Sequence, residues 1–136
     1  MSVKSHQHDV LVIGSGAAGM TLALKLSTDY QVALLCKDVS SEGSTYYAQG
    51  GVAAVLDEYD SIDSHIQDTL VAGAGICHTD VVKFTVEQSP AIIAWLVDLG
   101  VKFDTETAAD GRQEFHLTQE GGHSHRRVIH AADATG

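Results

Sequence analysis

The stretch DVLVIGSGAAGMTLALKL, residues 9–26, contains the pattern that decides the fold. Its first part, Val10–Ile13, is a continuous apolar run, which is typical of a strand buried on both faces of a parallel sheet. From Ala17 the spacing of small and apolar residues becomes that of a helix. A second apolar run, residues 31–35, predicts another strand, which the right-handed crossover rule places parallel to the first. The stretch therefore predicts a Rossmann-like βαβ unit of an α/β fold.

A glycine motif, GxGxxG, lies at the junction between the predicted strand and the predicted helix. In dinucleotide-binding proteins its glycines permit a tight turn, admit the pyrophosphate to the backbone and let the helix pack closely on the strand. The helix N-terminus adds unpaired N–H groups and the positive end of a dipole, both of which favour phosphate. We predict a dinucleotide cradle here; the alternative is a glycine-rich turn that binds no ligand. The cradle residues are Gly14, Ser15, Gly16, Ala17, Ala18 and Gly19.

The end of the second strand does not carry the carboxylate that binds ribose in NAD-binding proteins of this fold. Cys36, Lys37 and Asp38 occupy that place, so the acid is missing or displaced and the NAD fingerprint is incomplete. Lys37 is the candidate to contact a phosphate, or a ribose hydroxyl through its backbone.

Beyond residue 51 the pattern changes to short elements. Residues 52–55 predict a short strand, and Asp60 or Ser61 can cap a helix that ends near Gly73. The acidic residues at the start of this helix are expected to be solvated, since they stabilise a helix N-terminus. They are Asp57, Glu58, Asp60 and Asp63.

The next segment predicts two helices separated by proline. Thr79 or Asp80 is expected to cap the first, and Pro90 to occupy the first position of a second helix that ends at Gly100. Gly111 then marks a turn between two extended segments.

The chain is long enough for one domain with a polar tail. Residues 1–8 form that tail, and residues 9–136 contain all the predicted elements. A parallel sheet that begins with two strands needs further partners, so we expect residues 9–136 to be the N-terminal part of a domain in a longer chain.

Composition excludes several classes of function. The formal net charge is −10, from 18 acidic residues and 8 Lys and Arg, which repels nucleic-acid phosphates. No apolar run is long enough for a signal peptide or a membrane span. The two isolated cysteines, Cys36 and Cys77, are typical of reduced thiols in a cytoplasmic protein.

Three histidines near the C-terminus, His123, His125 and His130, raise the question of a zinc site. Two of them are two residues apart, glycines precede them and arginines follow, which makes a poor metal cage. We therefore expect no metal here. A solvated polar loop is one alternative for this segment.

Four stretches together resemble the L-aspartate oxidases, flavoenzymes of the succinate dehydrogenase and fumarate reductase flavoprotein family. They are DVLVIGSGAAGMTLALKL, EGSTYYAQGG, DSIDSHIQDTLVAGAGIC and HLTQEGGHSHRRVIHAADATG. The resemblance extends from Asp9 to Gly136, and its most specific parts are STYYAQGG and EGGHSHRR. It implies that residues 9–136 belong to an FAD-binding domain that is incomplete at its C-terminus.

The resemblance implies that residues 44–51 run beside the flavin ring and its ribityl–pyrophosphate arm. The residue types suit this role, because glycines allow close backbone approach while hydroxyls and an amide can serve a polar ring edge. A plain surface loop is the alternative. Ser44 stands where succinate dehydrogenases carry the histidine that links to the flavin, so FAD is expected to bind non-covalently. The implied contacts are Ser44, Thr45, Tyr46, Tyr47, Ala48, Gln49, Gly50 and Gly51.

The implied activity is oxidation of L-aspartate to iminoaspartate, the first step of NAD biosynthesis, with oxygen or fumarate as electron acceptor. Glu120 is implied to orient the substrate amino group. The family's proton-donating arginine lies beyond residue 136, so no catalytic residue is assigned here and this chain alone is expected to be inactive. The alternatives are a fumarate reductase-type flavoprotein and a non-catalytic dinucleotide-binding module.

Overall fold

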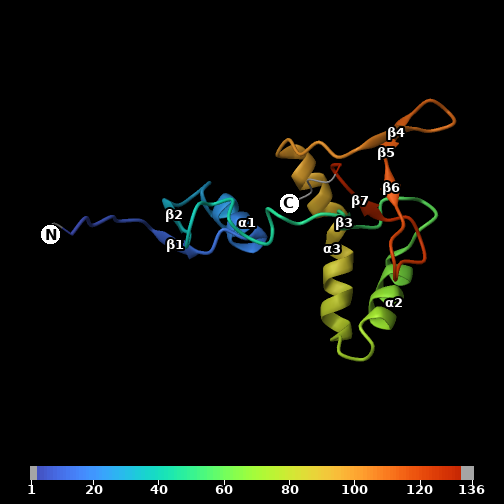
Figure 1. The fold of residues 1–136 in the computed structure, drawn as a ribbon, viewed down its shortest axis with the longest axis horizontal. Coiled ribbons are helices and arrows are strands. Elements are labelled where there is room, and N and C mark those ends of the chain that lie inside the picture. The colour runs from blue at the N-terminus through green and yellow to red at the C-terminus, as the bar shows by residue number, and fades with distance from the viewer. Residues whose placement is uncertain (1–2, 133–136) are drawn as a thin grey trace. The chain divides into compact units, whose positions relative to one another are not determined.

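The structure is a computed structural model that describes residues 3–132. The chain divides into two compact units, with the boundary between Ala48 and Gln49. Figure 1 shows the order of the elements along the chain. The boundary falls inside the STYYAQGG segment, so its two halves belong to different units.

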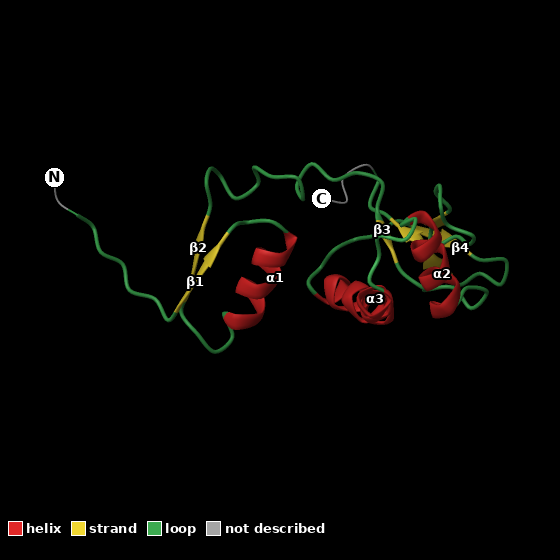
Figure 2. Cartoon of the chain, turned by 90° about the horizontal axis from the view of Figure 1, so that it is seen from below, coloured by secondary structure: helices red, strands yellow, loops and turns green. Residues whose placement is uncertain are grey.

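The first unit is the predicted strand–helix–strand arrangement. Its elements are β1 (Val10–Ile13), α1 (Ala17–Leu26) and β2 (Val32–Leu35). The strands are parallel, as predicted, with Val10 opposite Val32 and Ile13 opposite Leu35. Figure 2 shows α1 lying along this strand pair.

Burial of β1 differs from the prediction. Only Val12 is buried, while Leu11 and Ile13 are exposed, although an apolar run predicts burial on both faces. The physical reason is that one helix covers one face of a two-stranded sheet.

The second unit surrounds a small antiparallel sheet of order β3-β7-β6. Its helices pack against one another, and a separate hairpin joins β4 to β5. The core contains Ala54, Ile93, Phe103, Leu117 and Ile129. The elements are β3 (Val52–Ala53), α2 (Ile62–Ala72), α3 (Thr79–Asp98), β4 (Thr105–Thr107), β5 (Gln113–Phe115), β6 (Leu117–Thr118) and β7 (Val128–Ile129).

Helix α2 begins and ends at predicted positions. Ser61 is its N-cap, and the Ser61 hydroxyl accepts a hydrogen bond from the Ser64 N–H at 3.1 Å. Gly73 is its C-cap. Asp60, the other candidate cap, binds the Arg127 side chain instead.

Helix α3 contradicts the prediction of two helices separated at Pro90. It runs continuously from Thr79 to Asp98 with Pro90 inside it. A proline cannot donate to the carbonyl four residues earlier, which here belongs to Val86. The Ser89 hydroxyl donates to that carbonyl at 2.8 Å and so replaces the missing bond. The N-cap is His78, without a side-chain capping bond, and not Thr79 or Asp80.

The turn predicted near Gly111 is confirmed. It connects β4 and β5, which pair antiparallel with Glu106 opposite Glu114. Phe103 and Phe115 meet edge to face beside the hairpin, with ring centroids 6.2 Å apart. Within residues 3–132, no helix combines the length and the apolar character needed to cross a bilayer.

Candidate functional site

The glycine turn connects β1 to α1 and lies at the carboxyl ends of the two parallel strands. Gly14 adopts a φ of +106°, which favours glycine, and its N–H donates to the Leu35 carbonyl at 2.9 Å. A Cβ at Gly19 would lie 2.0 Å from the Gly14 carbonyl oxygen. Gly19 is therefore required by the protein itself, because only glycine lets α1 start this close to the turn.

Gly16 differs from Gly19 in this respect. A Cβ at Gly16 would meet only the Thr45 hydroxyl, at an ordinary contact distance of 3.6 Å. Gly16 is the N-cap of α1 and has an extended conformation that any residue can adopt. Packing among the described residues therefore does not require a glycine at this position.

Thr45 ties the first half of the STYYAQGG segment to this turn. Its hydroxyl accepts a hydrogen bond from the Ala17 N–H at 3.1 Å, so it caps α1 from 28 residues away. Ser15, Thr45 and Tyr46 line one cavity of about 190 Å³. The structure therefore brings predicted cradle residues together with predicted flavin contacts. Ala18 and Gly19 lie in the first turn of α1, where N–H groups have no partner within the helix.

The two tyrosines present large aromatic surfaces. Their rings meet edge to face with centroids 5.4 Å apart, and each residue is about 60% exposed. The Tyr47 hydroxyl donates to the Glu42 carboxylate at 3.0 Å. Three further predicted contacts are exposed and do not line the 190 Å³ cavity. They are Lys37, Ser44 and Ala48.

The second half of the segment belongs to the other unit. Gly51 has a φ of +115°, and a Cβ there would lie 2.3 Å from the Ile129 carbonyl oxygen, so packing against β7 requires this glycine. Gln49 is exposed. A Cβ at Gly50 would lie 3.5 Å from one carboxylate oxygen of Glu120. The predicted substrate-orienting residue and a predicted cofactor contact are therefore neighbours.

A buried arginine, Arg127, follows the loop that carries Glu120. Its side chain is 0% exposed, and the carboxylate of Asp60, 1% exposed, binds it through two hydrogen bonds of 2.8 and 2.7 Å. Arg127 also donates to Asp68 at 2.7 Å and to the Ser64 hydroxyl at 3.1 Å. The prediction that Asp60 is solvated is wrong, because its charge is paired with Arg127 inside the unit.

Sequence reasoning missed this network. The available signal was an arginine placed directly before the apolar pair Val128 and Ile129, where burial is expected. An arginine that enters a core needs an acidic partner, and the acidic start of α2 supplies it.

Asp68 is the acceptor that connects the network to the loop. The Ser124 N–H and hydroxyl donate to the same Asp68 oxygen at 2.7 and 2.8 Å. The hydrogen bond from the Ser124 backbone, followed by those from the Ser124 hydroxyl and Arg127, lowers the pKa of Asp68 to about 2. Its carboxylate therefore stays charged throughout the neutral and mildly acidic range.

The histidines do not converge on one point. His123 lies edge to face with the buried His65, at 5.7 Å between ring centroids. His125 contacts the Ser64 hydroxyl at 3.1 Å through Nδ1, while His130 pairs with His116 at 2.8 Å and with Asp104 at 3.2 Å. Burial, and next the positive charge of Arg127, lowers the pKa of His65. The three histidines thus have separate partners among the described residues.

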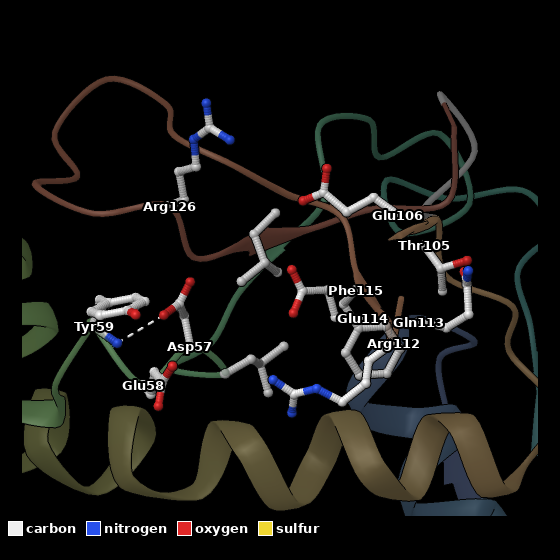
Figure 3. Close-up of a pocket in the computed structure, with 12 residues that line it drawn as sticks. Asp57, Glu58, Tyr59, Thr105, Glu106, Arg112, Gln113, Glu114, Phe115 and Arg126 are labelled. Atoms are coloured by element: carbon white, nitrogen blue, oxygen red, sulfur yellow. Dashed lines mark hydrogen bonds between the residues drawn. The ribbon is translucent and has the colours of Figure 1, made fainter. Parts of the chain in front are cut away.

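A cavity of about 660 Å³ lies between residues 56–59 and the β4–β5 hairpin (Figure 3). Its floor includes Phe115, and charged side chains of both signs, such as Glu114 and Arg112, surround it. None of the predicted cofactor residues lines this cavity, and neither does Glu120.

Comparison with known proteins agrees with the geometry of the glycine turn. A family model described as "FAD binding domain" matches residues 9–136. The chain is 60% identical to L-aspartate oxidase of Pseudomonas aeruginosa, over 96% of this chain and 25% of that protein. It is 56% identical to L-aspartate oxidase of Yersinia pestis, over 99% of this chain and 25% of that protein. The chain thus spans about a quarter of the length of these relatives.

Solved structures give the same fold. A quinol fumarate reductase of E. coli matches with a TM-score of 0.84 and 29% identity, over 98% of this chain and 23% of that chain. The Sdh1 complex of Mycobacterium smegmatis matches with a TM-score of 0.83 and 28% identity, over 96% of this chain and 22% of that chain. Since the family model covers nearly the whole sequence, the chain belongs to the FAD binding domain family.

Proposed function

We propose that residues 9–136 form the N-terminal part of a Rossmann-like FAD-binding domain in an L-aspartate oxidase. The identities of 56% and 60% to L-aspartate oxidases support this more strongly than the 29% identity to a quinol fumarate reductase supports the reductase alternative. The observation that carries the substrate assignment is the Glu120 carboxylate beside Gly50. The protein would act in the cytoplasm, with oxygen or fumarate as electron acceptor, and without nucleic-acid partners.

In this proposal the start of α1 binds the cofactor, and Glu120 orients the substrate. The N–H groups at the start of α1 and the open space at Gly16 receive the pyrophosphate of FAD. When bound, FAD supplies the redox chemistry by accepting a hydride equivalent from the substrate. Glu120 attracts the ammonium group of L-aspartate and so orients the substrate, since opposite charges at short range favour binding.

A substitution at Glu120 tests this proposal in the full-length protein. Glu120→Gln keeps the shape and removes the charge, so the binding of L-aspartate should weaken by roughly 1–3 kcal/mol, and its oxidation by about 5- to 150-fold. Fumarate has no ammonium group, and its reduction should be spared. Steady-state rates with both substrates at saturating and limiting concentration make the comparison. Glu114→Gln, an exposed acid on β5, is the control. Equal loss of both activities at Glu120 would assign it to the fold or the flavin instead.

The proposed FAD linkage is non-covalent, because Ser44 has a hydroxyl where a linking histidine would be needed. Acid precipitation of the holoprotein should release all of the flavin into the supernatant. The measurement is the flavin absorbance of pellet and supernatant. Flavin retained by the denatured chain would contradict this proposal, and a colourless protein that binds ADP or NAD would favour the non-catalytic module.

A further inference from the structure

The buried Arg127 network costs free energy that simple stability does not require. Removing a guanidinium and a carboxylate from water is expensive, and an apolar cluster of similar volume is often equally stable. Here Arg127 and Asp60 are both almost fully buried. Such a network does fix the directions of its members, because each hydrogen bond constrains an angle as well as a distance. The question is which part of the molecule it orients.

The loop between β6 and β7, residues 119–126, is the part that the network holds. Its base is closed by the Arg127 N–H, which donates to the Thr118 carbonyl at 3.1 Å. The Arg127 carbonyl accepts a hydrogen bond from the N–H of Ala54, a core residue, at 2.8 Å. The side chain of Arg127 then reaches Ser64 and Asp68 on α2, and Asp60 just before this helix.

Asp68 links this buried anchor to the far side of the loop. One of its oxygens accepts three hydrogen bonds, two from Ser124 and one from Arg127. A single Asp68 carboxylate oxygen thus binds both Ser124, near the end of the loop, and Arg127, at its base. Among the described residues, one other side chain outside the loop contacts Ser124. It is the neutral Ser64 hydroxyl, at 3.0 Å.

Short hydrogen bonds carry this constraint from Ser124 back to Glu120. The His123 backbone N–H donates to the Glu120 carbonyl at 3.1 Å, and the side-chain amide of Gln119 donates to the His123 carbonyl at 2.8 Å. Hydrogen bonds therefore close the segment from Gln119 to His123, and Ser124 follows it directly along the chain.

We propose that Asp68 is a positioning residue for Glu120, which it holds beside Gly50 through Ser124, so that the site selects an amino dicarboxylate. This inference rests on the proposed function for its substrate, whereas its geometric part concerns the loop alone. Asp68 touches neither substrate nor cofactor in this scheme. It acts by keeping the Glu120 carboxylate in one place.

The test uses Asp68→Ala in the full-length holoenzyme, with Asp63→Ala as the matched control. Asp63 lies on the same helix and is exposed. We expect Asp68→Ala to raise KM for L-aspartate about tenfold with a smaller change in kcat, since an orienting contact acts on binding. Fumarate reduction should fall much less, and FAD should remain bound. Hydrogen exchange of residues 119–126 should be faster in Asp68→Ala than in Asp63→Ala.

The outcomes separate this inference from the proposed function. If the unmodified enzyme does not oxidise L-aspartate, the proposed function fails, and hydrogen exchange alone decides whether Asp68 orders the loop. If L-aspartate is oxidised and the two variants share one KM, the positioning role is overturned. Equal losses with L-aspartate and fumarate would also overturn it, because they indicate a general structural role. Should Asp68→Ala not fold, Asp68→Asn keeps the shape, removes the charge and is measured in the same way.

Discussion

Arg127→Ala should lower the free energy of unfolding by about 3–5 kcal/mol, the largest loss of stability that we expect from substituting one charged residue. The reason is the Asp60 carboxylate, whose side chain is 1% exposed and which would lose both hydrogen bonds from the guanidinium. A buried charge without a partner is far more costly than the pair itself. Urea unfolding followed by circular dichroism measures the change.

The neighbouring arginine provides the matched control. Arg126 is exposed, so Arg126→Ala should change the free energy of unfolding by about 0.5 kcal/mol or less. The double variant Arg127→Ala with Asp60→Ala should lose less than the sum of the single variants, because neither charge is then left unpaired. If Arg127→Ala were no more destabilised than Arg126→Ala, the buried pair would not be holding this unit together.

Gly16→Val should reduce the affinity for FAD by roughly a hundredfold, or about 3 kcal/mol. A branched side chain would occupy the space through which the pyrophosphate approaches the start of α1. The protein itself tolerates atoms there, since a Cβ would meet only the Thr45 hydroxyl at 3.6 Å. Titration of the apoprotein with FAD, followed by flavin fluorescence, gives the affinity.

A second glycine distinguishes ligand binding from folding. Gly19→Ala should destabilise the first unit even without cofactor, because its Cβ would lie 2.0 Å from the Gly14 carbonyl oxygen. Gly16→Val should leave the thermal unfolding of the apoprotein nearly unchanged. Unaltered FAD affinity in Gly16→Val would show that this turn is not the cofactor cradle.

The sequence by itself determined the elements whose signals are local. The apolar run Val10–Ile13, the glycines after it and the helical spacing from Ala17 lie within a few residues of one another, and the strand–helix–strand arrangement follows them. Ser61, one of two candidate N-caps, and Gly73 mark the ends of α2 for the same reason, since a cap acts on N–H and carbonyl groups three or four residues away. The two-residue strands β6 and β7 are too short to show a period.

Only the tertiary structure decided the contacts between distant residues. Thr45 caps α1 across 28 residues, and Arg127 binds Asp60 across 67. Glu120 lies beside Gly50. The physical reason is common to these cases. A polar group must be paired when the fold buries it, but its partner depends on which segments packing brings together, and residue type or spacing along the chain does not encode that choice.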